Sequence, residues 1–466
     1  DLDNFQSTLE VDLINRWDFD DADFSYGAQA RRTYAERTRP ETNFNYREPF
    51  DYSATPFLPI TVTTPDNDPN TFIPDEQVLT ERVDYRAFST EVEVYDLALF
   101  ADYRRDIKLA DWLELVPSVG VRATYDDFLG NVNFAPRSNL TARLPWEVSL
   151  NLGYNRYYAK NQLLYALREN NPDIFVYQRG DPTSFEYGEW ELERQNLETA
   201  FSGSDLATPF SDEFTASITA PIWRLGEFRV KGLLRFSRDG FARSEPIVET
   251  RTNELGGTFE TRRFELTNRG EGEYRSLSFE WTKTVGNSTF GISSTISENE
   301  IAPGTATLLS NTELELENED VFFEGEVIPF RDLQVERENF NTPAYVSGYW
   351  IADWFENRLS TSLRGRFRPA YDAIVDTGDT VSIVTGTDAM GNDVVENLDE
   401  YEVQSLDDQF VIDAALAYRI SLPQDAELEL RVNIDNVFNV VPNVPVTRLN
   451  PYQQGRSYSF ATRLRF

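Results

Sequence analysis

The last twelve residues, Gly455-Arg-Ser-Tyr-Ser-Phe-Ala-Thr-Arg-Leu-Arg-Phe466, alternate between two kinds of side chain. Successive side chains of a β-strand point to opposite faces. One face of this stretch would carry Tyr458, Phe460, Leu464 and Phe466, and the other Ser457, Ser459, Ala461, Arg463 and Arg465. The stretch therefore predicts a strand that separates an apolar medium from a polar one, and it ends on an aromatic residue.

The same two-faced pattern recurs in about fifteen segments along the chain. In residues 228–236, for example, Phe228, Val230, Leu234 and Phe236 oppose Arg229, Lys231 and Arg235. Further clear segments are 113–125, 276–282, 359–368, 410–419 and 428–435. A soluble sheet can explain one or two such strands, whereas this number indicates an all-β chain whose strands face two media throughout.

The composition agrees with a membrane-spanning β-barrel. Aromatic residues make up 14% of the 466 residues, although the mean hydropathy is only −0.48. No run of about 18 apolar residues could form a spanning helix. A transmembrane barrel needs this mixture because lipid contacts one face of each strand and water contacts the other.

Charge and missing residue types exclude several classes of function. With 79 acidic and 43 basic residues the net charge is −36, which would repel nucleic-acid phosphates. The chain has no Cys and no His, so disulfides, thiol nucleophiles, His-based triads and the usual zinc sites are excluded. No pair of carboxylates is marked as catalytic. We therefore expect no nucleic-acid partner and no enzymatic activity.

Short and long connections alternate between the segments, as periplasmic turns and extracellular loops do in outer-membrane barrels. The short ones are Asp18–Asp21, Arg105–Asp111, Leu144–Trp146, Trp223–Glu227, Val285–Asn287, Trp354–Asn357 and Leu422–Asp425. The long ones are 36–87, 159–211, 242–271, 300–341, 372–407 and 438–454. The alternation holds if Asp126–Asn131 replaces one long loop and 242–271 is one loop containing a small hairpin.

An odd number of strands is unexpected, because single-chain bacterial barrels have even numbers. The first segment, Phe5–Trp17, would also leave an unpaired edge, and unpaired backbone groups cannot face lipid. We therefore expect residues 1–466 to be only part of an outer-membrane β-barrel domain, with further strands ahead of Asp1.

Two C-terminal motifs resemble those of TonB-dependent outer-membrane receptors. Glu427-Leu-Glu-Leu-Arg-Val-Asn-Ile-Asp-Asn-Val-Phe-Asn439 resembles their penultimate strand, which ends in Asn, a hydrophobic residue and Phe. Gly455–Phe466 resembles their last strand, and the rest of the chain agrees only in pattern. The resemblance implies a barrel of about 22 strands, of which the fifteen segments would be the last part. It also implies an N-terminal plug domain, which we do not expect within residues 1–466.

The resemblance implies import of a scarce solute of the siderophore, vitamin or oligosaccharide class, energised from the inner membrane. The implied location is the outer membrane of a Gram-negative bacterium. The expected partners are outer-membrane lipid and lipopolysaccharide, the plug, an inner-membrane energy-coupling protein and the solute. The alternative function is a passive porin-like channel of about sixteen strands.

Basic residues recur on the face that the strands are expected to turn to the lumen: Arg229, Lys231, Arg235, Arg364, Arg366, Arg368 and Arg431. They could hold a plug through ion pairs or guide an anionic solute. They could also be the polar lining that a wet barrel needs, paired with acidic neighbours. Arg364, Arg366 and Arg368 are the stronger candidates, because three cations on one face repel one another unless an acidic group lies opposite.

Two long connections carry candidate solute contacts: Tyr165, Tyr177, Arg179, Tyr187 and Trp190 in 159–211, and Arg448 and Tyr452 in 438–454. Aromatic rings beside polar groups suit sugars or aromatic chelates. They could equally form the connections' own small cores. The acidic groups Asp66–Asp68, Asp376–Asp379 and Asp388–Asp393 offer oxygen ligands for Ca²⁺, although none has the spacing of a calcium loop. We expect no other cofactor.

Overall fold

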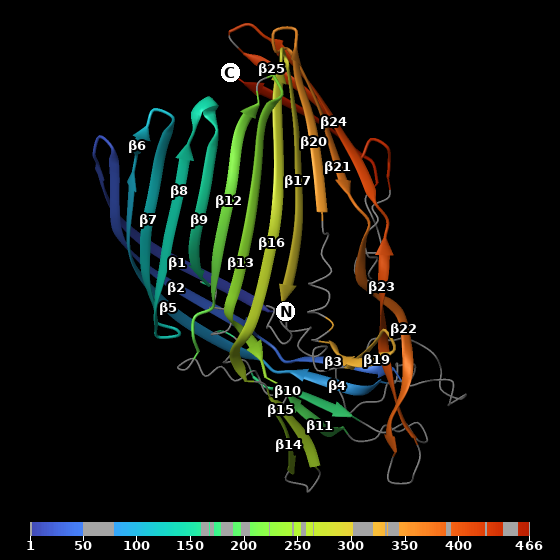
Figure 1. Ribbon diagram of the computed structural model, residues 1–466. Coiled ribbons are helices and arrows are strands. Elements are labelled where there is room, and N and C mark those ends of the chain that lie inside the picture. The colour runs from blue at the N-terminus through green and yellow to red at the C-terminus, as the bar shows by residue number, and fades with distance from the viewer. Residues whose placement is uncertain are drawn as a thin grey trace.

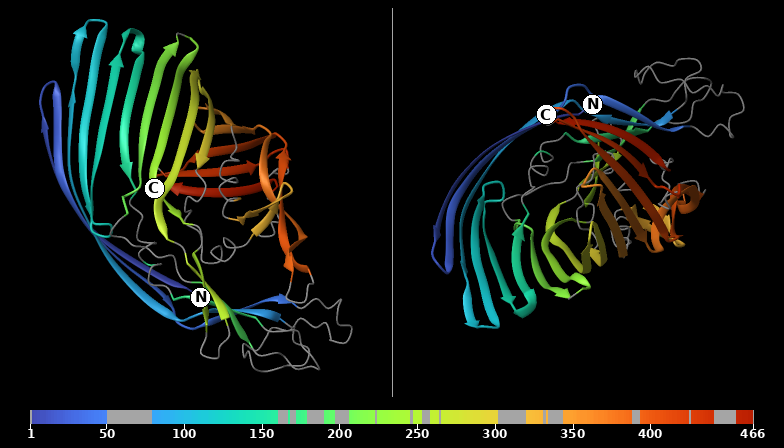
Figure 2. Two further views of the ribbon diagram at one scale, coloured as in Figure 1. Left: turned by 60° about the horizontal axis from the view of Figure 1, so that its bottom comes forward. Right: turned by 90° about the horizontal axis from the view of Figure 1, so that it is seen from above.

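The computed structural model describes residues 2–49, 79–159, 167, 172–178, 190–196, 206–222, 224–244, 247–252, 258–263, 265–301, 320–330, 333, 344–387, 393–424, 426–440 and 455–465. One large antiparallel sheet, which we call the wall, dominates it (Figure 1). Seen from above, the wall is strongly curved, with β7 to β17 on one side and both terminal strands on the other (Figure 2).

Fifteen strands follow one another in the wall, each paired with the next in chain order. They are β1 (Asp3–Asp18), β2 (Ala22–Arg39), β5 (Phe88–Arg105), β7 (Leu113–Asp126), β8 (Asn131–Arg143), β9 (Ser149–Tyr158), β12 (Phe210–Ile222), β13 (Gly226–Arg243), β16 (Leu266–Val285), β17 (Ser288–Ile301), β20 (Ala344–Trp354), β21 (Leu359–Arg368), β24 (Gln409–Ser421), β25 (Glu427–Asp435) and β26 (Ser457–Arg465). A short strand, β6 (Ile107–Ala110), also pairs with β7. The number and order predicted from the two-faced segments are confirmed.

The wall is not closed. Among the described residues, β1 pairs with β2 and β26 pairs with β25, and no ladder joins β1 to β26. The wall is thus a curved sheet with two open edges.

Alternation of side chains along each strand gives the wall an apolar outer face and a polar inner face. On β5, Leu97 and Leu99 are exposed on the outer face, whereas Asp96 and Ala98 turn inward. The ladder places Leu99 beside Ala28 of β2 and Ala123 of β7. Because neighbouring strands keep the same pairing for many residues, apolar side chains form continuous rows across the outer face.

The predicted short connections all join consecutive wall strands at one end, which we call the turn end (Figure 1). One of them contains a 3-10 turn at Pro145–Glu147. Among the described residues, no helix is long and apolar enough to cross a membrane.

The long connections lie at the opposite end, the loop end, and contain strands of their own. Six of these strands form the loop sheet: β3 (Asn43–Pro49), β4 (Leu79–Tyr85), β10 (Ile174–Gln178), β11 (Glu191–Asn196), β14 (Ile247–Thr252) and β15 (Thr258–Arg263). Four more, β18 (Asp320–Phe323), β19 (Glu326–Pro329), β22 (Tyr371–Thr387) and β23 (Asp393–Leu406), form a second sheet. The hairpin expected within 242–271 is confirmed, but the sequence did not predict the strands in the other connections.

One small apolar core lies at the loop end of the wall and another within the second sheet. Leu129, Leu206, Phe241 and Leu266 pack together where β7, β12, β13 and β16 reach the loop end. In the second sheet, Leu333 is fully buried against Val321, Phe330, Ile374 and Tyr401.

β13 and β16 lie close together where two glycines face each other. Gly240 is paired with Gly270, and the register shifts on both sides of Gly240. A Cβ added to Gly270 would lie 2.7 Å from the backbone carbonyl of Gly240. A side chain at this position would push the two strands apart at the bulge.

We predict that Gly270→Ala destabilises the wall, by about 1–3 kcal/mol, because the methyl group meets backbone that cannot move aside cheaply. Gly232→Ala is the matched control, since a Cβ there meets nothing within 4 Å. Urea-induced unfolding of the refolded protein would measure both changes. An equal effect of the two substitutions would contradict the close approach of β13 and β16.

Candidate functional site

The inner face of the wall carries a line of charged and amide side chains across β1, β2, β5 and β7. Arg31 forms an ion pair with Asp96, with its Nη2 2.6 Å from the carboxylate. Gln29 donates a hydrogen bond of 2.7 Å to Glu10 and accepts one from Arg122. Residues from four strands therefore form two polar groups on this part of the inner face.

Most of the basic residues predicted to line the lumen have partners on the same face. Arg235 donates two hydrogen bonds, of 3.1 and 2.5 Å, to Glu213, directly opposite on β12. Arg229 lies 3.7 Å from Glu280. Arg431 donates to the amide oxygen of Asn433 at 2.8 Å. At these positions the wall itself satisfies the charge or hydrogen-bonding capacity of the cation.

The three arginines of β21 have different surroundings. Arg366 forms an ion pair of 2.7 Å with Asp413 of β24, which is the acidic group that the repulsion argument requires. The guanidinium of Arg368 lies over the ring of Tyr371, 4.8 Å from its centroid. Arg364 faces Asp413 in the ladder, but within the described part of the chain it has no ion pair. Lys231 of β13 is likewise without an ion pair among the described residues.

The loop sheet is built around one buried arginine. The guanidinium of Arg82 lies over three rings, with its carbon 4.4 Å from the centroid of Tyr177, 5.2 Å from Trp190 and 5.5 Å from Phe44. Its Nε and Nη2 donate hydrogen bonds of 2.7 and 3.1 Å to the carboxylate of Asp84. Arg82 is only 9% exposed, so this cluster is a small core for the loop sheet.

Burial raises the pKa of Asp84, whereas the hydrogen bonds from Arg82 act in the opposite direction. On the other face of the same strands, Val83 and Val176 are paired and almost fully buried. The parallel pairing of β11 with β15 joins the connection 159–211 to the connection 242–271. Three separate connections thus form one unit at the loop end.

The chain is similar in fold to solved outer-membrane proteins. It matches the outer membrane transporter YddB from Escherichia coli with a TM-score of 0.60 and 18% sequence identity, over 99% of this chain and 54% of that one. The siderophore receptor PirA from Acinetobacter baumannii gives a TM-score of 0.54 and 11% identity, over 99% and 62%. The ferric enterobactin receptor PfeA from Pseudomonas aeruginosa gives a TM-score of 0.54 and 17% identity, over 99% of this chain and 54% of that one.

The chain has the fold of an outer-membrane receptor barrel. The resemblance seen in the two C-terminal motifs is thereby confirmed at the level of the fold. The chain spans 54% to 62% of the length of these three proteins. No protein-family model matches the sequence, and a search of curated proteins found no match.

The predicted lumen residues lie on the inner face of the wall but not at one place. Arg229 and Arg235 are on β13, the three arginines of β21 lie beyond β16, β17 and β20, and Arg431 is on β25. Nothing in the structure assigns them to a plug or to a solute, so those roles stay predictions.

Of the predicted loop contacts, Tyr177 and Trp190 lie together around Arg82. The others, Tyr165, Arg179, Tyr187, Arg448 and Tyr452, lie outside the described residues. The sequence analysis missed Arg82 and Asp84 as well as Arg31, Asp96 and Arg122. Because Arg31 and Arg32 are consecutive, one points to each face of the strand. The sequence around Arg31 therefore has no charged residues at alternate positions that would mark it as an inner-face residue.

The calcium prediction is not decided by the geometry. Asp66–Asp68 and most of Asp388–Asp393 lie outside the described residues. In the remaining group, Asp376–Asp379, the Asp376 side chain accepts a hydrogen bond of 2.8 Å from the backbone of Gly378, as a residue at a turn does. Within the described ranges, no group of three or more acidic residues could hold a metal ion.

We predict that Arg82→Met opens the loop sheet, because it leaves the buried Asp84 carboxylate without its counter-charge. Breaking such a pair costs about 3–5 kcal/mol, so amide exchange at Val83 and Val176 should accelerate by roughly 10² or more. Arg251→Met is the control, since the Arg251–Glu249 pair belongs to the same sheet but is half exposed. Unchanged exchange in Arg82→Met would show that the cluster does not hold the sheet together.

Proposed function

We propose that residues 1–466 form the wall of an outer-membrane receptor that imports a scarce solute with energy supplied from the inner membrane. The single observation that carries the proposal is the fold similarity to outer-membrane transporters and receptors over nearly the whole chain. The apolar outer face and the polar, ion-paired inner face support it, since these are the surfaces that a barrel presents to lipid and to its lumen.

In this proposal the loop end faces the cell exterior and the turn end faces the periplasm. Outer-membrane barrels have short periplasmic turns and longer extracellular loops, and the wall shows that asymmetry (Figure 1). The loop sheet then stands at the outer mouth of the barrel, where a solute arrives first. The protein would act in the outer membrane of a Gram-negative bacterium.

Two further parts belong to the proposal. Unpaired backbone groups at the edges of β1 and β26 cannot face hydrocarbon, so we propose that additional strands pair with both edges. A plug domain and an inner-membrane coupling protein follow from the resemblance to TonB-dependent receptors. The inner-face cations Lys231 and Arg364, which have no ion pair among the described residues, would then be available to the plug or the solute.

The first solute class to test is a ferric siderophore. PirA is by name a siderophore receptor and PfeA a ferric enterobactin receptor, and both share the wall fold. Vitamins and oligosaccharides are the alternatives within the same proposal. The net charge of −36 disfavours a strongly anionic solute unless inner-face arginines offset the repulsion.

Uptake in cells tests the proposal. A bacterial strain that lacks its own siderophore receptors would express the natural full-length protein and be offered siderophores loaded with radioactive iron, vitamin B12 and oligosaccharides in turn. We expect accumulation of one solute class, abolished by a protonophore. Failure to accumulate any of them would contradict the receptor function.

Conductance measurements distinguish the proposed receptor from the alternative function, a passive channel. A porin-like barrel would give a steady open conductance in planar bilayers without an energy source, whereas a plugged receptor would be closed. Large, persistent conductance by the full-length protein would therefore favour the channel and overturn energy-coupled import.

Membrane insertion predicts unequal tolerance of charge on the two faces of β24. Leu416 is 47% exposed on the outer face, and Ala415 beside it faces inward. Leu416→Arg should destabilise the inserted barrel by about 2–4 kcal/mol, because the guanidinium would lie in hydrocarbon. Ala415→Arg, in polar surroundings, should cost far less. Equal unfolding free energies of the two variants in lipid vesicles would contradict insertion with this face toward lipid.

A further inference from the structure

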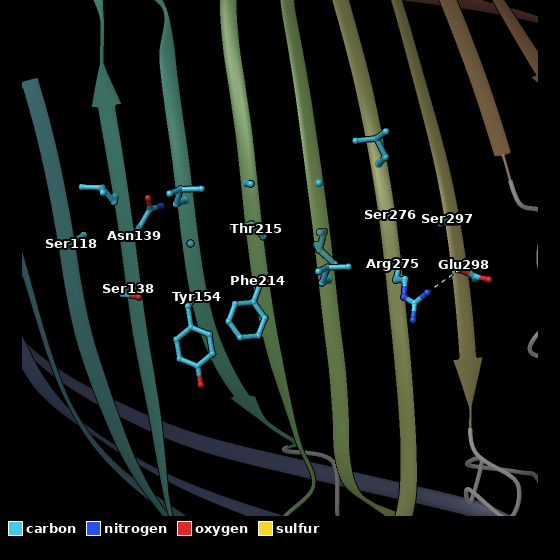
Figure 3. A pocket seen from close by; sticks show the side chains of 18 of the residues that line it. Ser118, Ser138, Asn139, Tyr154, Phe214, Thr215, Arg275, Ser276, Ser297 and Glu298 are labelled. Carbon is cyan, nitrogen blue, oxygen red and sulfur yellow. Dashed lines mark ion pairs between the residues drawn. The ribbon is translucent and has the colours of Figure 1, made fainter. Parts of the chain in front are cut away.

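A hollow lies on the outer face of the wall, not in the lumen. Its lining comes from β7 to β17 (Figure 3). It includes exposed aliphatic side chains of the outer face, among them Leu152, Leu277 and Ile296. Its volume is about 1240 Å³. The wall itself separates this hollow from the lumen, so it is not a candidate site for the imported solute.

The register of the strands explains the hollow. One row across the outer face reads Leu140, Leu152, Ala216, Gly232, Leu277 and Ile296, each opposite the next. The two smallest residues, Ala216 and Gly232, stand side by side in the middle of the row and form the floor. Large apolar residues flank them within the row on both sides.

The rows next to the floor along the strands carry larger apolar side chains. Toward the loop end stand Phe214 and Leu234, and toward the turn end stand Ile218 and Val230. A Cβ added at Gly232 would meet nothing within 4 Å, which shows that the floor is open. Ala216 and Gly232 thus form a recess two strands wide in the middle of the hollow, which we call the Ala216–Gly232 dent.

The rim of the dent toward the loop end is aromatic and charged. The rings of Tyr154 and Phe214 lie side by side with centroids 5.0 Å apart (Figure 3). The Tyr154 hydroxyl donates to Asp212 at 2.8 Å, and Arg156 donates to the same carboxylate at 2.8 and 2.7 Å. On the other side of the rim, Arg275 pairs with Glu273 at 2.5 Å and with Glu298 at 3.7 Å.

We propose that the Ala216–Gly232 dent holds one acyl chain of an outer-membrane lipid as an ordered, slowly exchanging ligand. The inference rests on the proposed membrane insertion, which places this face in hydrocarbon. The chain lies along β12 and β13, with the lipid's polar end at the Tyr154–Arg275 rim. Hydrocarbon in the dent touches side chains on four sides and backbone below, and so gains more dispersion contacts than it would on a flat wall.

A second copy of the protein fits the dent less well than a lipid does. A specific protein interface takes about 20–30 residues on each side, more than the dent and its rim provide. A convex barrel wall would bridge over the recessed floor without filling it.

The experiment compares lipid retention in full-length variants purified from outer membranes. Gly232→Leu fills the dent with a side chain that has space to enter it. Gly365→Leu is the matched control, because Gly365 lies on the outer face of β21, and a Cβ there makes only ordinary contact with Phe410, at 3.4 Å. After exhaustive exchange into detergent, native mass spectrometry counts the phospholipid and lipopolysaccharide molecules that remain on each chain.

We expect the unchanged protein and Gly365→Leu to keep lipid, and Gly232→Leu to keep roughly tenfold less, since it forfeits about ten carbon–carbon contacts. Equal retention by Gly232→Leu would overturn the proposal. So would a protein dimer that carries no lipid and that Gly232→Leu converts to monomer. Outer-membrane fractionation and heat-modifiable gel mobility of each variant report insertion separately, so a failure of the proposed function is distinguishable from an empty dent.

Discussion

The antiparallel backbone ladder of the wall is the constraint on which every other feature depends. Because side chains alternate with period two, a slip of one residue would turn a whole strand's apolar face to the inner side of the wall. The fifteen strands avoid this through long, unbroken pairings, such as the eighteen residue pairs from Ala22–Arg105 to Arg39–Phe88 between β2 and β5. The same ladder that keeps Leu97 and Leu99 outside brings Arg31 to Asp96 inside. The same strand pairing therefore separates apolar from polar side chains and brings the ion-pair partners together.

The wall could be predicted because its signal is local. Each strand carries both faces within about ten residues, so the strand that ends at Arg465 is readable without its neighbours. The loop sheet could not be predicted, because it depends on contacts between distant connections. β11 pairs with β15 across some sixty residues of sequence, and Arg82 meets Tyr177 and Trp190 from another connection. Short polar strands of this kind have no alternation strong enough to mark them.

The sequence predicted on which face of the wall the candidate residues lie, but not which residues they form ion pairs with. Alternation alone placed Arg229, Arg235 and Arg366 on the inner face, and the structure agrees. Their acidic partners come from neighbouring strands and depend on the register. Arg235 meets the residue directly opposite it, Glu213, whereas Arg366 reaches Asp413, which stands opposite Arg364. That diagonal contact gives Arg366 a counter-charge, and the guanidinium of Arg368 lies over the ring of Tyr371.

The Ala216–Gly232 dent shows what the register adds to an alternating pattern. In the sequence, Ala216 and Gly232 are weak members of two separate apolar stripes, and neither interrupts its strand. Only the pairing of β12 with β13 puts the two side by side, surrounded by leucines. In water such a hollow would sacrifice buried area, because the wall would lose contacts that water cannot replace. On a surface that faces hydrocarbon, a lipid chain in the dent replaces those contacts. Two small residues therefore cost the wall little stability there, and the lipid in the dent completes the outer surface of the wall.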